Sequence, residues 1–390
     1  MRVLKSLFSN RLAHSSEGAS PAREGSLYNV PEYDPILYGL ASPQYHRLKL
    51  GENNLFSGCV LALGNKSVRG LAVFSNGKLI GTFPVDSPRE DIAATFPHLA
   101  GAKRCGFDFE LLVEPAYGDL IFDIIFDDGS REFFFKYDLS LLKLMSGKFA
   151  AMQHTIDGIK LPDGDLIFMT QGHRDVNAYA NSIIPFIVNV RRYLEHCGID
   201  IEGLRTILDF GCGSGRALVG WYADDPGRKL LGCDINDELV SWAKKNLPKA
   251  ITFDRTFMEP PLPYAGSSVD MVELISVFTH LLLDTQKRWI REFQRILKPG
   301  GYLLVTLQGE AYVRLFGSGS EDFKRSGYFE NSGATEGSNG IGTYHALGFV
   351  KNLFDGFEVI GYFSEGKIRG ERVLFQIASQ QDVYLLRLRD

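Results

Sequence analysis

Ten residues in the middle of the chain, Ile207–Arg216 (ILDFGCGSGR), constrain the fold more than any other stretch. They indicate a short apolar strand, a turn with glycine at every second position, and the start of a helix. A helix start presents unpaired backbone N–H groups and the positive end of the helix dipole, so it can hold an anionic group. Glycine lacks a Cβ, which lets a ligand approach the backbone closely. The stretch therefore predicts an α/β domain with a ligand site at the turn.

Strand-like and helix-like segments alternate from residue 204 onward. The expected strands are 206–210, 229–234, 250–253, 269–275 and 302–307. Helices are expected after the glycine turn, after Asn236 as an N-cap, and from Asp284. Such βαβ alternation requires a parallel, doubly wound sheet. Two more strands, 357–363 and 382–387, are expected to close the domain.

The carboxyl edge of this sheet carries the candidate binding residues. Ligands of open parallel sheets bind beyond the carboxyl ends of the strands, where Gly211, Gly213 and Gly215 fall. Asp234, at the end of the second strand, lies where an acid hydrogen-bonds ribose hydroxyls. A dinucleotide and an adenosyl ligand both satisfy this pattern.

Two details favour the adenosyl ligand. The glycines are spaced G-x-G-x-G, which departs from the dinucleotide fingerprint, and Asp209 lies two residues before the first of them. An acid there repels a pyrophosphate but suits an ammonium group. A zwitterionic amino-acid tail fits both the glycine turn and Asp209, because its carboxylate can bind backbone N–H groups while its ammonium lies near the acid. The sequence therefore predicts S-adenosylmethionine as the ligand. An NAD(P)-dependent oxidoreductase is the disfavoured alternative.

Four ordered segments resemble the motifs of class I S-adenosylmethionine-dependent methyltransferases. They are 207–216, 231–235, 260–272 and 295–301. The resemblance implies a Rossmann-like sheet of seven strands with the last strand antiparallel. It also implies that Ile235 packs on the adenine and that Met258 lies near that ring. We assign Ser276, which follows the fourth strand, to the cofactor site as well.

The string Ser276–Leu281 (SVFTHL) resembles bacterial methyltransferases found beside glycan-modifying enzymes. This resemblance implies a sugar, a glycan or a related small molecule as the acceptor, methylated on oxygen. A hydroxyl acceptor gains from a general base, most often His, Asp or Glu. His280, after the fourth strand, and His345, after a long polar loop, are the candidate catalytic bases.

Sequence patterns divide the chain into three expected segments. We expect a leader and irregular arm at 1–45, a β-sandwich at 46–140, and the methyltransferase domain at 141–390, with its core at 204–308 and a lid-like loop at 309–342. Hairpin signals such as Asn76-Gly77 predict the sandwich, which resembles a module often attached to glycan enzymes. Residues 141–166 are expected to be a connector. Because no catalytic constellation stands out, a non-catalytic scaffold with a methyltransferase-like domain is the alternative function.

The composition of the chain limits which classes of binding partner we expect. The net charge is −5 without a long Lys/Arg cluster, which predicts no nucleic-acid partner. No apolar run approaches the roughly 20 residues that span a bilayer. The five cysteines are scattered and form no metal-binding motif, which favours a reducing cytoplasm and no metal site. The sequence indicates no particular oligomeric state.

Overall fold

The structure is a computed structural model of the 390-residue chain. It describes residues 9–11, 36–43, 47–62, 65–95, 99–316, 320–331, 333–338, 340–368, 377–378 and 381–389. The chain divides into two compact units, Val3–Met145 and Ser146–Asp390. Among the described residues, no helix combines the length and the apolar character needed to cross a membrane.

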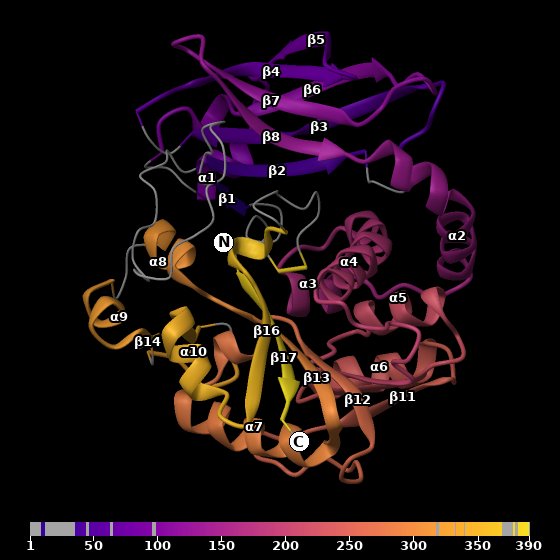
Figure 1. Ribbon diagram of the computed structural model, residues 1–390. Helices are drawn as coiled ribbons and strands as arrows, with labels where there is room; N and C mark the ends of the chain where they lie inside the picture. The colour runs from indigo at the N-terminus through magenta and orange to yellow at the C-terminus, as the bar shows by residue number, and fades with distance from the viewer. Residues whose placement is uncertain are drawn as a thin grey trace. The chain divides into compact units, whose positions relative to one another are not determined.

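The first unit contains two four-stranded antiparallel sheets (Figure 1). One has the order β1 (Ser9–Arg11), β2 (Ile36–Ser42), β3 (Asn53–Ala62) and β6 (Gly106–Leu112). The other has the order β5 (Lys78–Pro84), β4 (Val68–Ser75), β7 (Leu120–Phe126) and β8 (Arg131–Tyr137). The short helix α1 (Glu90–Thr95) and the 3₁₀ helix η2 (Ala102–Arg104) lie between strands β5 and β6.

Both expected hairpins are present in the second of these sheets. Strands β4 and β5 pair across Asn76 and Gly77, whose φ angles of 49° and 73° are those that a tight hairpin turn needs. Strands β7 and β8 form the other hairpin. Aromatic rings from the two sheets contact each other, as in the pair Phe56 and Phe122, whose centroids are 5.3 Å apart. The two sheets therefore share an aromatic core.

The arm expected over 1–45 is wrong at its end. Residues Ile36–Ser42 form β2, a strand paired with β3, and its first five side chains are buried. The rest of that expected arm, apart from β1, lies outside the described residues. Long-range pairing, which a local pattern does not reveal, makes this stretch a strand.

The segment 141–166, expected as a connector, is mostly helical. Helix α2 spans Leu139–Asp157, and α3 spans Gly164–Gln171. The Asp163 side chain caps α3 by accepting hydrogen bonds from the backbone N–H groups of residues 165 and 166. Helix α4 (Val176–His196) follows, capped in the same way by Asp175, and it runs through Pro185 without being split.

The second unit is built on a seven-stranded sheet of order β11-β10-β9-β12-β13-β17-β16 (Figure 1). The strands are β9 (Thr206–Phe210), β10 (Lys229–Asp234), β11 (Ile251–Arg255), β12 (Val269–Leu274), β13 (Leu297–Leu307), β16 (Phe357–Phe363) and β17 (Asp382–Leu388). Strands β9 to β13 pair in parallel, whereas β17 is antiparallel to both of its neighbours. The predicted Rossmann-like sheet with an antiparallel last strand is confirmed.

Helices cover this sheet. They are α5 (Arg216–Asp224), α6 (Asp237–Asn246), α7 (Leu283–Ile296) and α10 (Leu347–Leu353). Trp289 and Phe293 of α7 pack on Phe210 of β9, with ring centroids 4.5 Å and 5.1 Å apart. On α5, Gly220 allows close contact with Ile187 of α4, since a Cβ there would lie 2.3 Å from the Ile187 Cγ1 atom.

The polar segment 309–342, expected as a lid-like loop, contains regular structure. It holds α8 (Glu310–Phe316), α9 (Ser320–Ser326) and strand β14 (Tyr328–Asn331), which pairs with β15 (Gly342–His345). Part of it is fixed to the 3₁₀ helix η3 (Phe278–His280), which follows β12. The N–H of Gly337 donates to the carbonyl of His280, and the Thr343 hydroxyl donates to the carbonyl of Phe278.

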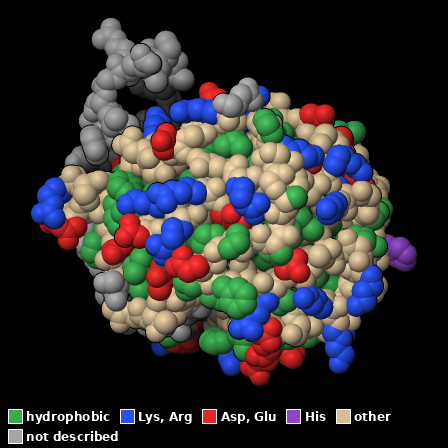
Figure 2. Space-filling view, turned by 90° about the horizontal axis from the view of Figure 1, so that it is seen from below, with side chains coloured by type: hydrophobic (Ala, Val, Ile, Leu, Met, Phe, Trp, Pro, Cys, Tyr) green, Lys and Arg blue, Asp and Glu red, His purple; other side chains and the backbone are tan. Residues whose placement is uncertain are grey.

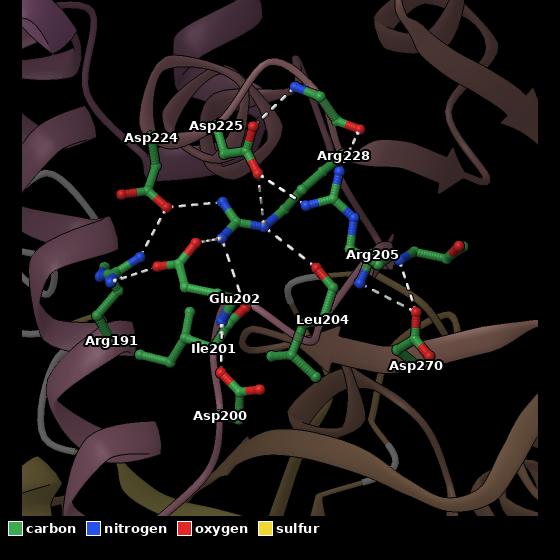
Figure 3. A network of polar contacts seen from close by, with 12 residues as sticks. Arg191, Asp200, Ile201, Glu202, Leu204, Arg205, Asp224, Asp225, Arg228 and Asp270 are labelled. Carbon is green, nitrogen blue, oxygen red and sulfur yellow. Dashed lines mark hydrogen bonds and ion pairs between the residues drawn. The ribbon is translucent and has the colours of Figure 1, made fainter.

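A buried ion network holds the amino edge of the sheet (Figure 3). The Arg228 guanidinium is fully buried and donates to Asp224 at 2.7 Å and to the Leu204 carbonyl at 3.2 Å. Arg191 and Lys148 pair with the same Asp224 carboxylate. The network therefore joins α2, α4 and α5 at the end of the sheet opposite the glycine turn.

Candidate cofactor and acceptor site

The glycine turn connects β9 to α5 at the carboxyl edge of the sheet. Gly211, Gly213 and Gly215 have φ angles of 80°, 55° and 85°, values that L side chains rarely adopt. The backbone N–H groups of Gly211 and Cys212 both donate to the carbonyl of Cys233, at 2.8 Å and 3.0 Å. These bonds tie the turn to the end of β10, where Asp234 follows.

The three glycines are also required by the protein's own packing. A Cβ on Gly211 would lie 2.5 Å from Val277 Cγ2, and one on Gly213 would lie 2.6 Å from Thr170 Cγ2. A Cβ on Gly215 would meet the side chain of Leu247 at 2.6 Å. The expectation that these glycines serve close ligand approach is therefore incomplete, because neighbouring side chains already exclude a Cβ.

Asp234 closes the turn from the β10 side. Its Oδ2 atom accepts the N–H of Gly213 and its Oδ1 atom accepts the N–H of Asn236, each at 2.8 Å. Burial raises the pKa of this carboxyl, while the backbone hydrogen bonds act to lower it. The next side chain, Ile235, is 44% exposed. A carboxylate thus lies directly beside an open apolar side chain, which suits a ribose joined to an aromatic base.

Asp209 is buried on the α5 side of the sheet, with 4% of its surface exposed. Its neighbour in register on β12 is Glu273, which is fully buried. Burial raises the pKa of Asp209 to about 7, and the Arg216 guanidinium opposes this shift. No hydrogen bond reaches the Asp209 carboxylate from the part of the chain that the structure describes.

Ser276 lies in a closed ring of hydrogen bonds at the end of β12. Its N–H donates to the Thr306 hydroxyl at 2.8 Å, and that hydroxyl donates to Gln381 Oε1 at 2.7 Å. The Gln381 amide in turn donates to the Ser276 hydroxyl at 2.8 Å. Ser276 has a φ of 61°, which is uncommon for a residue with a side chain. The ring holds this strained turn in place.

Gln381 precedes Asp382, a buried carboxyl at the same edge of the sheet. Asp382 accepts the backbone N–H of Glu365 at 2.9 Å and the Tyr362 hydroxyl at 3.1 Å. Its pKa is raised to about 7, first of all by burial. No local sequence pattern points to Gln381 or Asp382, because each of them contacts partners far away along the chain.

His280 is half-buried on η3, where segment 309–342 contacts it. Its Nδ1 atom is 3.1 Å from the carbonyl of Ile341. A carbonyl only accepts, so this bond places the imidazole proton on Nδ1 and the lone pair on Nε2.

His345 is fully buried, and this placement does not suit a base. Its Nε2 atom is 3.0 Å from Gln286 Oε1, and burial lowers its pKa to about 3. Among the described residues, no group forms a hydrogen bond with the buried Nδ1 atom. A buried neutral imidazole cannot meet an acceptor hydroxyl, so the structure speaks against His345 as the catalytic base.

Met258 lies against segment 309–342. A Cβ on Gly337 would be 2.8 Å from the Met258 Cε atom, and the Met258 carbonyl accepts the Trp289 indole N–H at 3.0 Å. Its position near an adenine stays a prediction. Among the described residues, no three His, Cys, Asp or Glu side chains gather closely enough to hold a metal ion.

The chain is similar to known proteins over the parallel strands of the second unit. Residues 208–305 match the family described as Methyltransferase domain. The chain is 32% identical over 26% of its length to the tRNA (carboxymethyluridine(34)-5-O)-methyltransferase of Arabidopsis thaliana. It is 35% identical over 26% of its length to a demethylmenaquinone methyltransferase of Chlorobaculum parvum. The matched stretches span only 24% and 41% of these relatives.

A solved structure from Methanosarcina mazei, titled as a SAM-dependent methyltransferase, is 22% identical and covers 51% of this chain and 96% of its own, with a TM-score of 0.38. The sheet order, the site at its carboxyl edge and the family match define a class I S-adenosylmethionine-dependent methyltransferase domain in the second unit. S-adenosylmethionine is the cofactor that this domain implies. The buried Asp209 carboxylate, which accepts no hydrogen bond from the described residues, and the exposed Ile235 side chain fit its ammonium group and its adenine.

Proposed function

We propose that the whole chain is an S-adenosylmethionine-dependent methyltransferase that methylates a hydroxyl oxygen of its acceptor. The observation that carries this proposal is the His280 imidazole, whose Nδ1 proton is committed to the Ile341 carbonyl. The bound cofactor supplies a methyl group on a positively charged sulfur. His280 accepts the hydroxyl proton at Nε2 as the acceptor oxygen attacks, which makes that oxygen a stronger nucleophile.

The other residues bind and orient. Asp234 accepts hydrogen bonds from ribose hydroxyls, and Ile235 and Met258 contact the adenine. The first turn of α5 holds the tail carboxylate with its backbone N–H groups, and Asp209 faces the tail ammonium. Alignment of acceptor, methyl group and sulfur accounts for much of the rate, so residues that only position the reactants matter. Ser276 and its hydrogen-bonded ring hold the end of β12 in place at the carboxyl edge of the sheet.

We propose a sugar or glycan-linked molecule as the acceptor, and the sequence resemblance around Ser276–Leu281 supports this choice. The two sheets of the first unit, Val3–Met145, would act as a β-sandwich interaction module. The expectation of no nucleic-acid partner has lost support, because several matched relatives are named tRNA methyltransferases. On the face drawn in Figure 2, Lys and Arg side chains are interspersed with Asp and Glu.

A transfer assay with tritium-labelled cofactor tests the proposal directly. The acceptor panel comprises nucleotide sugars, glycan fragments, bulk tRNA and a quinol. We expect label on the sugar class and base-stable, ether-linked methyl groups in the product. Label on tRNA alone would contradict the acceptor class but keep the enzyme, whereas no transfer to any acceptor, despite cofactor binding, would favour the scaffold alternative.

A further inference from the structure

Three charged side chains lie together under the glycine turn. Asp209 on β9 and Glu273 on β12 are neighbours in register on adjacent strands, so both project from the same face of the sheet. Arg216 begins α5 directly after the turn. Asp209 and Glu273 are 4% and 0% exposed. Two carboxyl groups and one guanidinium therefore share a region from which water is largely excluded.

In their observed contacts, the two carboxyl groups are not ion-paired with the nearby guanidinium. The Arg216 Nη1 atom is directed to the Ser182 hydroxyl at 3.3 Å, and its guanidinium lies 4.8 Å from the centroid of the Phe186 ring. Within the described chain, no ion pair joins Arg216 to either carboxylate. Glu273 accepts the Trp221 indole N–H at 3.2 Å through Oε2, while no described residue forms a hydrogen bond with its buried Oε1 atom.

The other ionisable groups that face Asp209 add no positive charge. They are Asp234 at the end of β10, Tyr179 on α4, Cys212 in the turn and Cys233 on β10. Burial and the nearby Asp209 carboxylate raise the pKa of Glu273 well above its usual range. Burial, together with the Asp234 carboxylate, raises the pKa of Asp209 to about 7, against the opposing effect of Arg216. Two carboxyl groups this close titrate as a unit, and at neutral pH the pair retains a proton.

We propose that the Asp209–Glu273 pair holds a proton in the free protein and releases it to solvent when the ammonium group of the methionine tail comes to lie beside Asp209. The carboxyl O–H bond breaks, the proton passes to the buffer, and the ammonium supplies the compensating positive charge, with no change of oxidation state. This inference rests on the proposed function. Glu273 takes part as a positioning residue, because it sets the protonation of Asp209 without touching the cofactor.

The direction in which pH changes ligand affinity follows from the linkage between proton release and ligand binding. The bound complex favours the ionised pair, so affinity for a ligand with the amino-acid tail rises as pH rises through the titration of the pair. Below that range, each unit of pH weakens binding by up to about tenfold for one released proton. A ligand without the tail does not offer the ammonium, and its affinity is expected to be independent of pH over the same range.

Calorimetry on the full-length protein tests this without any variant. S-adenosylhomocysteine carries the amino-acid tail, whereas 5′-methylthioadenosine keeps the nucleoside and sulfur but lacks the tail. Titrations at pH 7 in buffers of different ionisation enthalpy give the number of protons exchanged. We expect release of up to about one proton with S-adenosylhomocysteine and none with methylthioadenosine.

Three variants separate the roles within the cluster. Glu273→Gln keeps the shape but removes one carboxylate, so Asp209 ionises more easily, and proton release at pH 7 falls toward zero while S-adenosylhomocysteine still binds. Asp209→Asn abolishes the release and weakens S-adenosylhomocysteine by about tenfold or more, with methylthioadenosine unaffected. Glu358→Gln, at an exposed carboxylate on β16, changes neither quantity.

The inference is overturned if both ligands bind with equal proton exchange, if S-adenosylhomocysteine releases no proton, or if Glu273→Gln leaves the proton count unchanged. Thermal unfolding of each variant shows whether it has kept its fold. Failure of both ligands to bind the wild-type protein would overturn the proposed function, and this inference with it. Normal binding without proton release would overturn the inference alone.

Discussion

Asp234 accepts a hydrogen bond from the backbone N–H of Gly213, so the end of β10 and the glycine turn are joined by one carboxylate. The same carboxylate is the proposed ribose ligand. We expect Asp234→Ala to weaken S-adenosylhomocysteine binding by about tenfold to a hundredfold, the range for hydrogen bonds to a charged group. Calorimetry measures this directly.

Two further variants make that result specific. Asp234→Asn keeps the shape and one accepting oxygen, so its effect should be smaller than that of alanine. Asp237→Ala removes an exposed carboxylate in the first turn of α6 and should leave affinity unchanged. Wild-type affinity in Asp234→Ala would remove this residue from the ribose site.

His280 gives a kinetic prediction. Removing a general base typically costs about 10²–10⁴-fold in rate, so His280→Ala should lower kcat by that range while cofactor affinity stays the same. His154→Ala, at an exposed histidine on α2, is the control. A His280→Ala enzyme with wild-type kcat would show that another group, or none, takes the proton.

His345 should behave as a structural residue. His345→Gln disturbs the contact with Gln286 and is expected to destabilise the protein by about 1–3 kcal/mol, with kcat of the folded fraction nearly unchanged. The lowered pKa also predicts acid sensitivity. Because the unfolded imidazole binds a proton below pH 6.5 and the buried one does so only near pH 3, stability is lost as pH falls through this window.

Denaturant titrations between pH 4 and 8 check both statements. The pH dependence over this window should be smaller in His345→Gln than in the wild type. A large loss of kcat in a fully folded His345→Gln protein would return this histidine to the active site.

The raised pKa of Asp382 predicts the opposite pH dependence of protein stability. Its folded pKa of about 7 exceeds the ordinary value of 3.8, so the folded state binds the extra proton and stability falls as pH rises from about 4 to 7. Asp382→Asn mimics the protonated form and can keep the bond from the Glu365 N–H. We expect this variant to be more stable than the wild type at pH 8 and closer to it at pH 5. Equal stability at both pH values would show that Asp382 is ionised in the folded protein.

Asp224 tests the ion network at the opposite edge of the sheet. Asp224→Asn removes the nearest charged partner of the buried Arg228, which keeps its contacts with Glu202 and Asp225. Losing one member of a buried pair costs about 3–5 kcal/mol, so we expect a loss of stability up to that range. The control is Asp284→Asn at an exposed site on α7. Because the network lies away from the glycine turn, cofactor affinity of the folded variant should be unchanged. Calorimetric unfolding and ligand titration give both quantities.

Local signals accounted for much of this fold. The strands at 206–210 and 229–234, the hairpin at Asn76-Gly77 and the cap at Asn236 were predictable because each depends on residues close together in the chain. Strand β2 and helices α2 and α3 were missed. Strand β2 is stabilised by long-range pairing, which a local pattern does not reveal.

Some residues of the candidate site could likewise be placed from local sequence, and others could not. Asp209 and Asp234 could be placed because strand ends fix the edge on which they lie. His345 could not, because its burial depends on packing against Gln286, 59 residues earlier in the chain. The link between Ser276 and Gln381 spans 105 residues and leaves no local pattern.

The crowding around the glycine turn has a consequence for evolution. Val277, Thr170 and Leu247 leave no room for a Cβ at the three glycines, whatever the turn binds. A descendant that had abandoned methyl transfer would still need those glycines for as long as these neighbours remained. In this lineage the G-x-G-x-G signature would therefore outlast the chemistry, and loss of Asp209 or His280 would be the earlier mark of a pseudoenzyme.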